Sequence, residues 1–303
     1  MMKTQRIVRP LAALLLVLIM AGCSLSSDPL RSSGQTSAAP DLVVGAPETA
    51  EGAVLAQLYA GALQTKGITV GIEPVGERVD YLQQLRGGTI ALVPDHTGAL
   101  LTELKPDQAA STATEVDDQL PAAAGADLTV ITPAPATAQT VYVITKAVSD
   151  QRKITTLDEL AAITAGTVLG GPAGLEQQKY GPAALTAIYG ITFASVKAYP
   201  DSTALARDLG TGTISAAAFA ANDPVLAGDS FVRLADPESM VLPQNITAVA
   251  GPALKANPTA IAAIEAVHAA LTTQELTVLQ SQVGSGTPVE QVAADWLKAK
   301  SLA

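Results

Sequence analysis

Short apolar runs alternate with amphipathic stretches along most of the chain, from residue 41 to the C-terminus. Residues 52–67 have apolar side chains at helical spacing, from Val54 to Leu63, and Gly67 predicts the end of that helix. Residues 41–47, which precede it, form a short valine-containing run that is typical of a strand. Because strand and helix patterns of this kind alternate, the sequence predicts an α/β protein with mostly parallel sheets.

The alternation continues through two successive series. The predicted strands are residues 41–47, 68–75, 89–95, 127–134, 141–145, 167–172, 196–200, 214–221, 230–235 and 246–250. Helical patterns fill most of the segments between them, and three further helices are predicted at the end of the chain, over residues 257–273, 274–283 and 287–300. The acidic pair Asp117-Asp118 before Pro121 indicates a surface loop.

Two α/β series followed by a returning strand predict two lobes. We expect the first lobe to comprise residues 41–137 together with 246–303, and the second lobe to comprise residues 138–245. The chain would therefore cross between the lobes twice. In such a fold a ligand binds at the carboxyl ends of the strands, which places it in a cleft between the lobes.

Residues 1–22 have the pattern of a secretory signal, with three positive charges and no acidic residue around a short apolar run. Cys23 follows Ala21-Gly22 and resembles the lipidated first residue of a mature bacterial lipoprotein. A buried thiol after a plain signal peptide is the alternative. The residues after Cys23, up to residue 40, are mainly Ser, Pro and small side chains, which predicts a flexible tether. We therefore expect export and attachment to the extracytoplasmic side of the cell membrane through the lipid alone.

Composition removes several classes of function. The net charge of −10 argues against a nucleic-acid partner, which needs a basic surface. A single cysteine excludes a disulfide framework and a cysteine-rich zinc site, and two histidines leave little material for metal binding or histidine-based catalysis. One of them, His268, lies in an alanine-rich helical stretch, where we expect it on the surface or half-buried. Neither a P-loop nor a dinucleotide-binding glycine motif occurs.

Several segments in a fixed order resemble one family of transport proteins. They are VVGAPETAEGAVLAQLYAGAL, LRGGTIALVPDHTGALL, ALARDLGTGTISAAAFAANDP and the final PVEQVAADWLKAKSLA. Together they resemble the osmoprotectant-binding proteins of ABC importers, the glycine betaine/choline type that includes ProX-like and OpuAC-like proteins. The resemblance covers residues 41–303. It implies a two-lobed periplasmic-binding-protein-like fold of type II, a small-molecule solute, permease and ATPase partners, no catalysis and no cofactor. We expect the protein to be a monomer.

In that family a quaternary ammonium ligand lies in a cage of aromatic rings and is held by cation–π attraction. At three positions where the family often has an aromatic residue, this chain has Asp95-His96, Ala221-Asn222 and Gln139-Thr140. The resemblance therefore implies a degraded cage. We expect a more polar site that favours a solute with hydroxyl or amide groups.

Ten residues that follow predicted strands or lie at the predicted crossovers match ligand-bearing segments of the family. These candidates for ligand binding are Thr49, Glu51, His96, Thr97, Gln139, Thr140, Asn222, Asp223, Gln244 and Asn245. Structural alternatives are a helix cap for Thr49 and a partner of the helix dipole for Glu51. An Asx turn would equally explain Asn222 and Asp223, and a hinge would explain Gln244 and Asn245. For His96 the alternative is an exposed histidine at the edge.

Three hypotheses for the function follow. The first is a lipid-anchored solute receptor of an ABC importer. The second is a cell-envelope module that has kept the fold without a transport role, and binds a protein partner or an apolar, polyphenol-like ligand. The third is an enzyme that reuses the scaffold, because a fold does not determine a function; the missing nucleophile–base pair argues against it.

Overall fold

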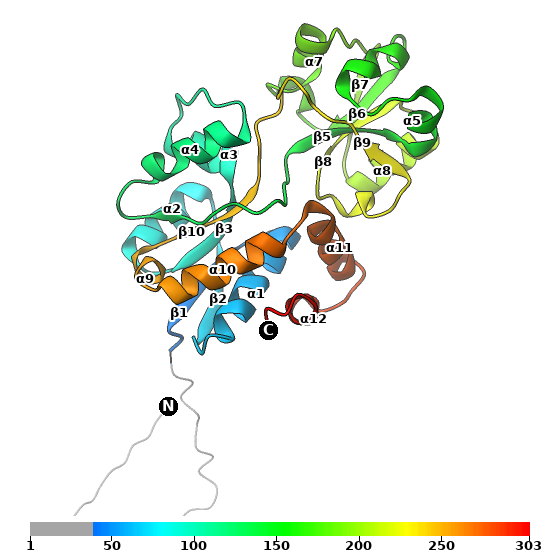
Figure 1. Ribbon diagram of the computed structural model, residues 1–303. Coiled ribbons are helices and arrows are strands. Elements are labelled where there is room, and N and C mark those ends of the chain that lie inside the picture. The colour runs from blue at the N-terminus through cyan, green and yellow to red at the C-terminus, as the bar shows by residue number, and fades with distance from the viewer. Residues whose placement is uncertain (1–38) are drawn as a thin grey trace, which may run out of the picture. The chain divides into compact units, whose positions relative to one another are not determined.

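Two five-stranded sheets organise the part of the chain that the structure describes (Figure 1). The computed structural model describes residues 39–303. The predicted signal peptide, Cys23 and most of the tether lie outside the described residues. Pro40–Ala303 forms one unit. Among the helices of residues 39–303, none is both long enough and apolar enough to cross a membrane.

The first sheet contains strands from both ends of the described chain. Its order is β2 (Val70–Val75), β1 (Leu42–Pro47), β3 (Leu92–His96), β10 (Ile246–Ala250) and β4 (Thr129–Val130). β2 and β3 run parallel to β1, whereas β10 runs antiparallel to β3 and β4. Ile246 and Ala248 belong to one hydrophobic cluster and Val249 to another. Because neighbouring strand residues point to opposite faces, both faces of this sheet are packed.

The second sheet is built from a continuous part of the chain. Its order is β7 (Ser195–Tyr199), β6 (Val168–Pro172), β8 (Ala216–Ala220), β5 (Thr140–Thr145) and β9 (Phe231–Arg233). β6 runs parallel to β7 and β8, whereas β5 runs antiparallel to β8 and β9. Each sheet thus has one antiparallel strand next to its parallel strands. The predicted α/β class with two lobes is confirmed.

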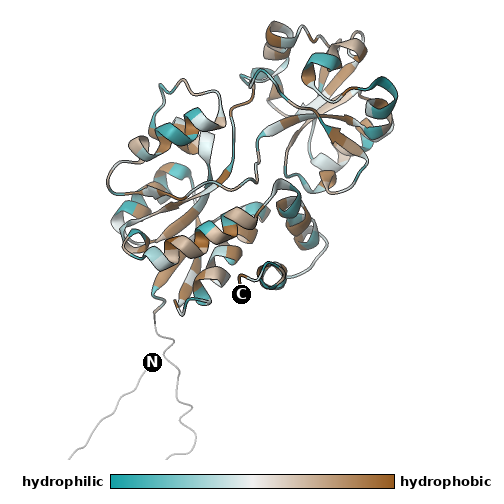
Figure 2. Cartoon of the chain, in the orientation of Figure 1, coloured by the Kyte–Doolittle hydropathy of each residue, from teal (hydrophilic) through white to brown (hydrophobic). Residues whose placement is uncertain are grey.

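Helices follow most strands. Those that accompany the first sheet are α1 (Ala50–Gln64), α2 (Arg78–Gly87), α3 (Thr97–Leu104), α4 (Ala113–Ala124), α9 (Pro252–Lys255), α10 (Pro258–Ala270), α11 (Thr273–Gly284) and α12 (Val289–Ala299). Those that accompany the second sheet are α5 (Lys146–Arg152), α6 (Leu157–Leu160), α7 (Pro182–Tyr189) and α8 (Ser202–Gly210), with short 3₁₀ helices η1 (Ala161–Ile163), η2 (Leu175–Gln177) and η3 (Pro224–Leu226). Hydrophobic residues follow the strands of both sheets, whereas α4 and α5 present hydrophilic residues (Figure 2).

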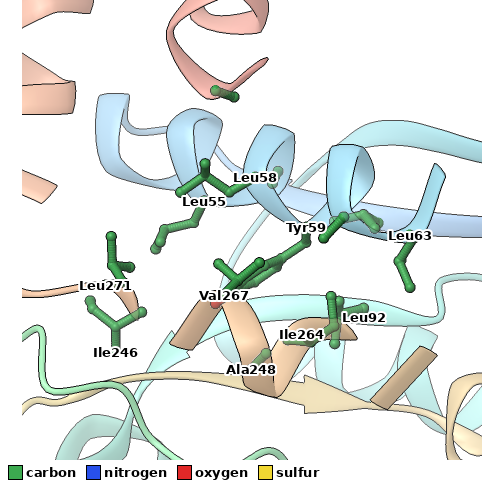
Figure 3. Packing of buried hydrophobic residues seen from close by; sticks show 14 of the residues in the cluster. Leu55, Leu58, Tyr59, Leu63, Leu92, Ile246, Ala248, Ile264, Val267 and Leu271 are labelled. Carbon is green, nitrogen blue, oxygen red and sulfur yellow. The ribbon is translucent and has the colours of Figure 1, made fainter. Parts of the chain in front are cut away.

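The helix α1 forms the centre of the largest hydrophobic core. Leu55 and Tyr59 of α1 belong to one buried cluster that also contains Ala248 of β10 and Val267 of α10 (Figure 3). Trp296 of α12 belongs to this cluster as well and is 8% exposed. The C-terminal helices therefore complete the lobe that the N-terminal strands begin.

Two crossover segments connect the sheets and pair with each other. The backbone N–H of Ala138 donates to the carbonyl of Gln244 over 3.0 Å, and Thr137 forms an isolated antiparallel bridge with Asn245. The hydroxyl of Thr137 also donates to the carbonyl of Gln244, over 3.1 Å. This short ribbon joins the two lobes; the exact lobe boundaries given above stay a prediction.

The interpretation of Asp117-Asp118 as a surface loop is wrong, because both residues lie inside α4. The helix begins with a capping box in which the N–H of Glu115 donates to the hydroxyl of Thr112, while the Glu115 carboxylate accepts from the N–H of Thr112. Pro121 lies within the helix. The sequence did contain a helix-start signal, the capping box of Thr112 and Glu115, but the acidic pair and the proline favoured a loop.

Candidate functional site

A cavity of about 340 Å³ opens where three parallel strands of the first sheet end. Pro47 ends β1, Val75 ends β2 and His96 ends β3, and all three line the cavity. The other lining residues come from the end of β3, from the turns after β1 and β2, and from the beginnings of α1 and α2: Glu48, Thr49, Glu51, Gly52, Leu55, Gly76, Glu77, Arg78, Tyr81, Pro94 and Asp95. This is the edge at which α/β sheets bind ligands.

The start of α1 places Thr49 and Glu51 at the cavity. Thr49 is the N-cap, and its hydroxyl accepts from the N–H of Gly52 over 2.9 Å. A Cβ atom at Gly52 would lie 2.4 Å from the carbonyl oxygen of Pro47. Because only glycine permits this close approach, the turn from β1 into α1 is tight and fixes Glu51 in the first helical turn.

The carboxylate of Glu51 accepts hydrogen bonds from both lobes. Nε2 of His96, at the end of β3, donates to Oε1 over 2.7 Å. Nδ2 of Asn222, just after β8 in the second sheet, donates to Oε2. Only 15% of the Glu51 side chain is exposed, so both oxygens are held by protein donors.

The carboxylate of Glu51 shifts the pKa of His96. Burial works to lower the pKa of His96, but the hydrogen bond and the negative charge of Glu51 outweigh burial, and the pKa is raised above its usual value. Asp95 acts in the same direction and Arg78 against it. Because a carboxylate can only accept, the proton of this hydrogen bond lies on Nε2. When the imidazole takes up its second proton, it forms an ion pair with Glu51.

A second charged cluster lies at the same end of β3. Arg78 donates to the Asp95 carboxylate from Nε over 3.0 Å and from Nη2 over 2.7 Å. The hydroxyl of Tyr81 donates to the same carboxylate over 2.5 Å. Burial raises the pKa of Tyr81, and the charge of Asp95 adds to this. Asp95 is therefore a buried anion whose oxygens are fully engaged.

Four of the candidate residues lie in or beside the crossover ribbon. The N–H of Asn245 donates to the Thr97 hydroxyl over 3.1 Å, and the N–H of Thr97 donates to the Asn245 carbonyl over 3.0 Å. Oε1 of Gln244 accepts from the N–H of Ala99 over 3.0 Å, which satisfies a free donor at the start of α3. Gln139 is half-buried, and its N–H donates to the hydroxyl of Thr137. The side chains of Thr97 and Gln244 and the backbone of Asn245 therefore tie the ribbon to α3, whereas the Gln139 bond lies within the ribbon.

A second cavity, of about 360 Å³, lies where the parallel strands of the second sheet end. Thr140 and Asp223 line it, together with Tyr199, Asp201 and Ser202. The Asp223 carboxylate accepts from the N–H of Val225, the second residue of η3, and from the hydroxyl of Ser202. The Asx turn considered for this segment is therefore present at Asp223.

Besides its side-chain bond to Glu51, Asn222 is held through its backbone. Its carbonyl accepts from Nε2 of Gln280 in α11 over 3.1 Å, and this bond is buried. Gln274 of α11 donates to the carbonyl of Ala227 nearby. Although α11 belongs with the first sheet, it thus contacts the second lobe beside the Glu51–Asn222 bond.

Comparison with known proteins identifies the family. Residues 40–299 match the family model described as the substrate-binding domain of an ABC-type glycine betaine transport system, OpuAC. The chain belongs to this family. None of the curated protein sequences matches it. The OpuAC family comprises substrate-binding proteins of ABC importers, and the expectation of such a protein is confirmed at this level.

Solved structures share the fold of this OpuAC-family chain. A glycine betaine/carnitine/choline ABC transporter structure has a TM-score of 0.80 at 18% identity, over 86% of this chain and 99% of the other. The ligand-free structure of YehZ from Escherichia coli has a TM-score of 0.77 at 21% identity, over 88% and 100% of the two chains. Lactococcal OpuAC, closed around glycine betaine, has a TM-score of 0.52 at 14% identity, over 86% and 96%.

The sequence candidates of this OpuAC-family member fall into three groups. Thr49, Glu51 and His96 meet in the first cavity, and Asn222 reaches Glu51 from the second lobe. Thr140 and Asp223 line the second cavity. Thr97, Gln139, Gln244 and Asn245 lie in or beside the crossover ribbon, where their contacts are mainly with backbone groups.

Sequence reasoning missed Arg78, Tyr81 and Asp95. Asp95 directly precedes His96 in a segment that carries the family resemblance, and this position was the signal that could have made it a candidate. Arg78 and Tyr81 share one face of a helix at a spacing of three residues. Their common partner is set by sheet pairing, which the helix pattern does not reveal.

The expectation for His268 is wrong, because it is buried rather than on the surface or half-buried. Nδ1 lies 2.6 Å from the Thr132 carbonyl, which can only accept, so Nδ1 carries the proton. The hydroxyl of Tyr59 then donates to Nε2 over 2.7 Å. Burial lowers the pKa of His268 to about 4. It is a neutral core residue.

Residues 39–303 contain no group of three or more His, Cys, Asp or Glu side chains arranged to hold a metal ion. Four of the side chains that line the first cavity pair with one another, Arg78 with Asp95 and His96 with Glu51, while Glu48 and Glu77 are exposed at its edge. The arrangement offers hydrogen-bond acceptors and negative charge to a bound molecule.

Proposed function

We propose that this OpuAC-family protein is the extracytoplasmic receptor of an ABC importer for a small polar solute other than glycine betaine. The observation that supports the proposal most directly is the position of Glu51. Its carboxylate lies at the strand ends of one lobe and accepts hydrogen bonds from His96 of that lobe and Asn222 of the other. A group at this position is sensitive both to a ligand and to the separation of the lobes.

In this proposal the solute lies between the two cavities. Thr49, Glu51 and His96 contact it from the first lobe, and Thr140, Asn222 and Asp223 contact it from the second. Thr97, Gln139, Gln244 and Asn245 act mainly at the hinge, with lobe boundaries at residues 137/138 and 245/246. The hydrogen bonds of the ribbon support the hinge assignment.

The proposed preference for a polar solute rests on the side chains of the first cavity. Tyr81 is the one phenol among the described lining residues, it is 4% exposed, and its hydroxyl donates to Asp95. A trimethylammonium group gains about 0.5–2 kcal/mol from each ring that it contacts. Two further rings, Tyr199 and Phe219, line the second cavity, and they are only 7% and 4% exposed. With all three rings largely covered, hydrogen bonding replaces cation–π attraction as the main source of affinity.

We further propose that residues 1–22 direct export and that Cys23 carries lipid, which retains the protein at the membrane next to a permease and an ATPase. The motive is the position of Cys23 after Ala21-Gly22 and before a tether of small polar residues. Changing Cys23 to Ser should release the protein from the membrane fraction or leave the precursor uncut. A processed Cys23→Ser protein that stays on membranes would contradict the anchor.

A thermal-shift screen of residues 40–303 tests the receptor function. The panel contains amino acids, sugars, polyphenols and quaternary amines. A receptor should gain about 2.7 kcal/mol of stability when its ligand is present at 100 times Kd. We expect at least one polar solute to stabilise the protein, and His96→Ala and Asn222→Ala to reduce that effect. Tight binding of glycine betaine, or equal binding by both variants, would contradict the proposed site.

A further inference from the structure

We propose that Glu51 binds a cationic nitrogen of the solute, and that this nitrogen carries N–H donors, as in a primary or secondary ammonium group. The inference rests on the proposed receptor function and names the chemistry that its site selects.

Each oxygen of Glu51 accepts one N–H, from His96 on one side and from Asn222 on the other. The side chain is 15% exposed, so water has little access to the carboxylate. A solute that enters between Glu51 and Asn222 displaces the second donor. A mostly buried carboxylate that loses a donor must receive another, because an unpaired buried charge is strongly unfavourable.

The charge around Glu51 favours a cation as the incoming group. The first cavity is lined by four acidic residues, of which Asp95 is paired with Arg78 and Glu51 with His96. Glu48 and Glu77 add two exposed negative charges at its edge. The second cavity is lined by Asp201 and Asp223, and the described residues that line it include no Lys or Arg. A cation between the cavities is therefore attracted from both sides.

Methylation of the cationic nitrogen distinguishes two sources of affinity, because it removes N–H donors and leaves the positive charge available for cation–π attraction. A trimethylammonium group has no N–H, so it cannot replace the donor that Asn222 gives to Glu51. It also needs exposed aromatic faces, whereas Tyr81 in the first cavity and Tyr199 and Phe219 in the second are only 4%, 7% and 4% exposed. An ammonium group with two or three N–H donors satisfies Glu51 directly through charge-assisted hydrogen bonds.

The test is a methylation series measured by calorimetry on residues 40–303. One series runs from ethanolamine through its N-methyl and N,N-dimethyl forms to choline, and the other from glycine to glycine betaine. We expect affinity to fall along each series, by on the order of tenfold from the unmethylated to the trimethylated member. Affinity that is flat or rises with methylation would overturn the proposal, as would a failure of every N–H-bearing member to bind at millimolar concentration.

Two variants assign the effect to the carboxylate. Glu51→Gln keeps the size of the side chain and removes its charge, and it should abolish the difference between ethanolamine and choline. Glu73→Gln is the matched control, because Glu73 is exposed on β2 and lies outside the cavity; it should leave both affinities unchanged. Circular dichroism confirms that each variant is folded. A Glu51→Gln protein that keeps the preference for ethanolamine would show that another group makes the selection.

The outcomes also separate this inference from the receptor function. If choline or glycine betaine binds while ethanolamine and glycine do not, the protein is a receptor and the inference is wrong. If neither series nor any solute of the wider panel stabilises the protein, the receptor function and the inference both fail. If the N–H-bearing members bind best and Glu51→Gln removes the preference, both stand.

Discussion

Arg78 binds the carboxylate of Asp95 with two nitrogens of its guanidinium group, at 3.0 Å from Nε and 2.7 Å from Nη2. The side chain of Asp95 is 1% exposed and that of Arg78 is 26% exposed. Burial works to lower the pKa of Arg78, but its hydrogen bonds and charge interaction with Asp95 outweigh burial and raise it. The pair therefore stays charged, and it fixes the end of β3 next to His96.

Replacement of Arg78 by Ala should lower the free energy of unfolding by about 3 kcal/mol, because it leaves the buried carboxylate of Asp95 without its countercharge. Urea unfolding measures the change. The double variant Arg78→Met/Asp95→Leu should recover much of the loss, since it removes both charges. Lys146→Ala is the control: it breaks an exposed pair with Asp150 and should cost less than about 0.5 kcal/mol. Equal effects of Arg78→Ala and Lys146→Ala would show that Asp95 is solvated.

His268 should make the protein less stable in acid. Its pKa is lowered to about 4 in the folded protein, against about 6.5 in the unfolded chain. The stability that depends on neutral His268 is thus fully present above pH 6.5 and is lost as the pH falls toward 4. The wild type should lose about 2 kcal/mol more than His268→Gln between about pH 7.5 and pH 5. Parallel slopes for the two proteins in urea unfolding would contradict the buried neutral imidazole.

His96 should titrate in the opposite sense, because the pKa of His96 is raised by Glu51. Its contribution to stability is fully present below about pH 6.5 and is lost as the pH rises through the raised pKa. With two histidines in the chain, proton NMR can follow both rings. We expect Glu51→Gln to lower the pKa of His96 and to leave His268 unchanged as an internal control. If the pKa of His96 is the same in the wild type and in Glu51→Gln, the pair does not form in solution.

Gly98 should not tolerate even one extra methyl group. A Cβ atom there would lie 2.4 Å from the carbonyl oxygen of Pro243, where the crossover ribbon crosses the first turn of α3. We expect Gly98→Ala to lower the free energy of unfolding by about 1–3 kcal/mol, as overpacking typically does. Gly87→Ala is the matched control, because a Cβ at Gly87 meets nothing within 4 Å. If both variants melt at the temperature of the wild type, the ribbon does not press on α3.

The alternation of apolar runs was sufficient to predict the class of fold. Each strand and helix buries the apolar side chains of its own short segment, so its periodicity is visible in the local sequence. Two local predictions were incomplete for local reasons. The strand expected over residues 127–134 is reduced to Thr129–Val130, because the pairing with β10 becomes irregular after it: Ile131 donates to the Ala248 carbonyl, and the next such bond comes only from Ala134, to Ile246. The helix α4 was overlooked because Asp117, Asp118 and Pro121 suit a loop, whereas the capping box at Thr112 suits a helix.

The site was less accessible from sequence, because its bonds join residues that are far apart in the chain. Glu51 and Asn222 are separated by 171 positions, and both were candidates only through their places at strand ends and their match to the family. Nothing in either segment shows that they touch. His268 illustrates the same limit: its partners Tyr59 and Thr132 come from other elements, 209 and 136 positions away. Only the assembled sheets define such contacts.

The place of β10 inside the first sheet has a consequence for the order in which a newly made chain can fold. Residues 140–233 contain all five strands of the second sheet, so that lobe can form while the rest of the chain is still being synthesised. β3 and β4, in contrast, have β10 between them, and β10 ends at residue 250. Until then both strands keep an unpaired edge, and an open edge invites pairing with other chains. The lobe that begins first is therefore finished last, and an unfinished chain is most prone to aggregate there.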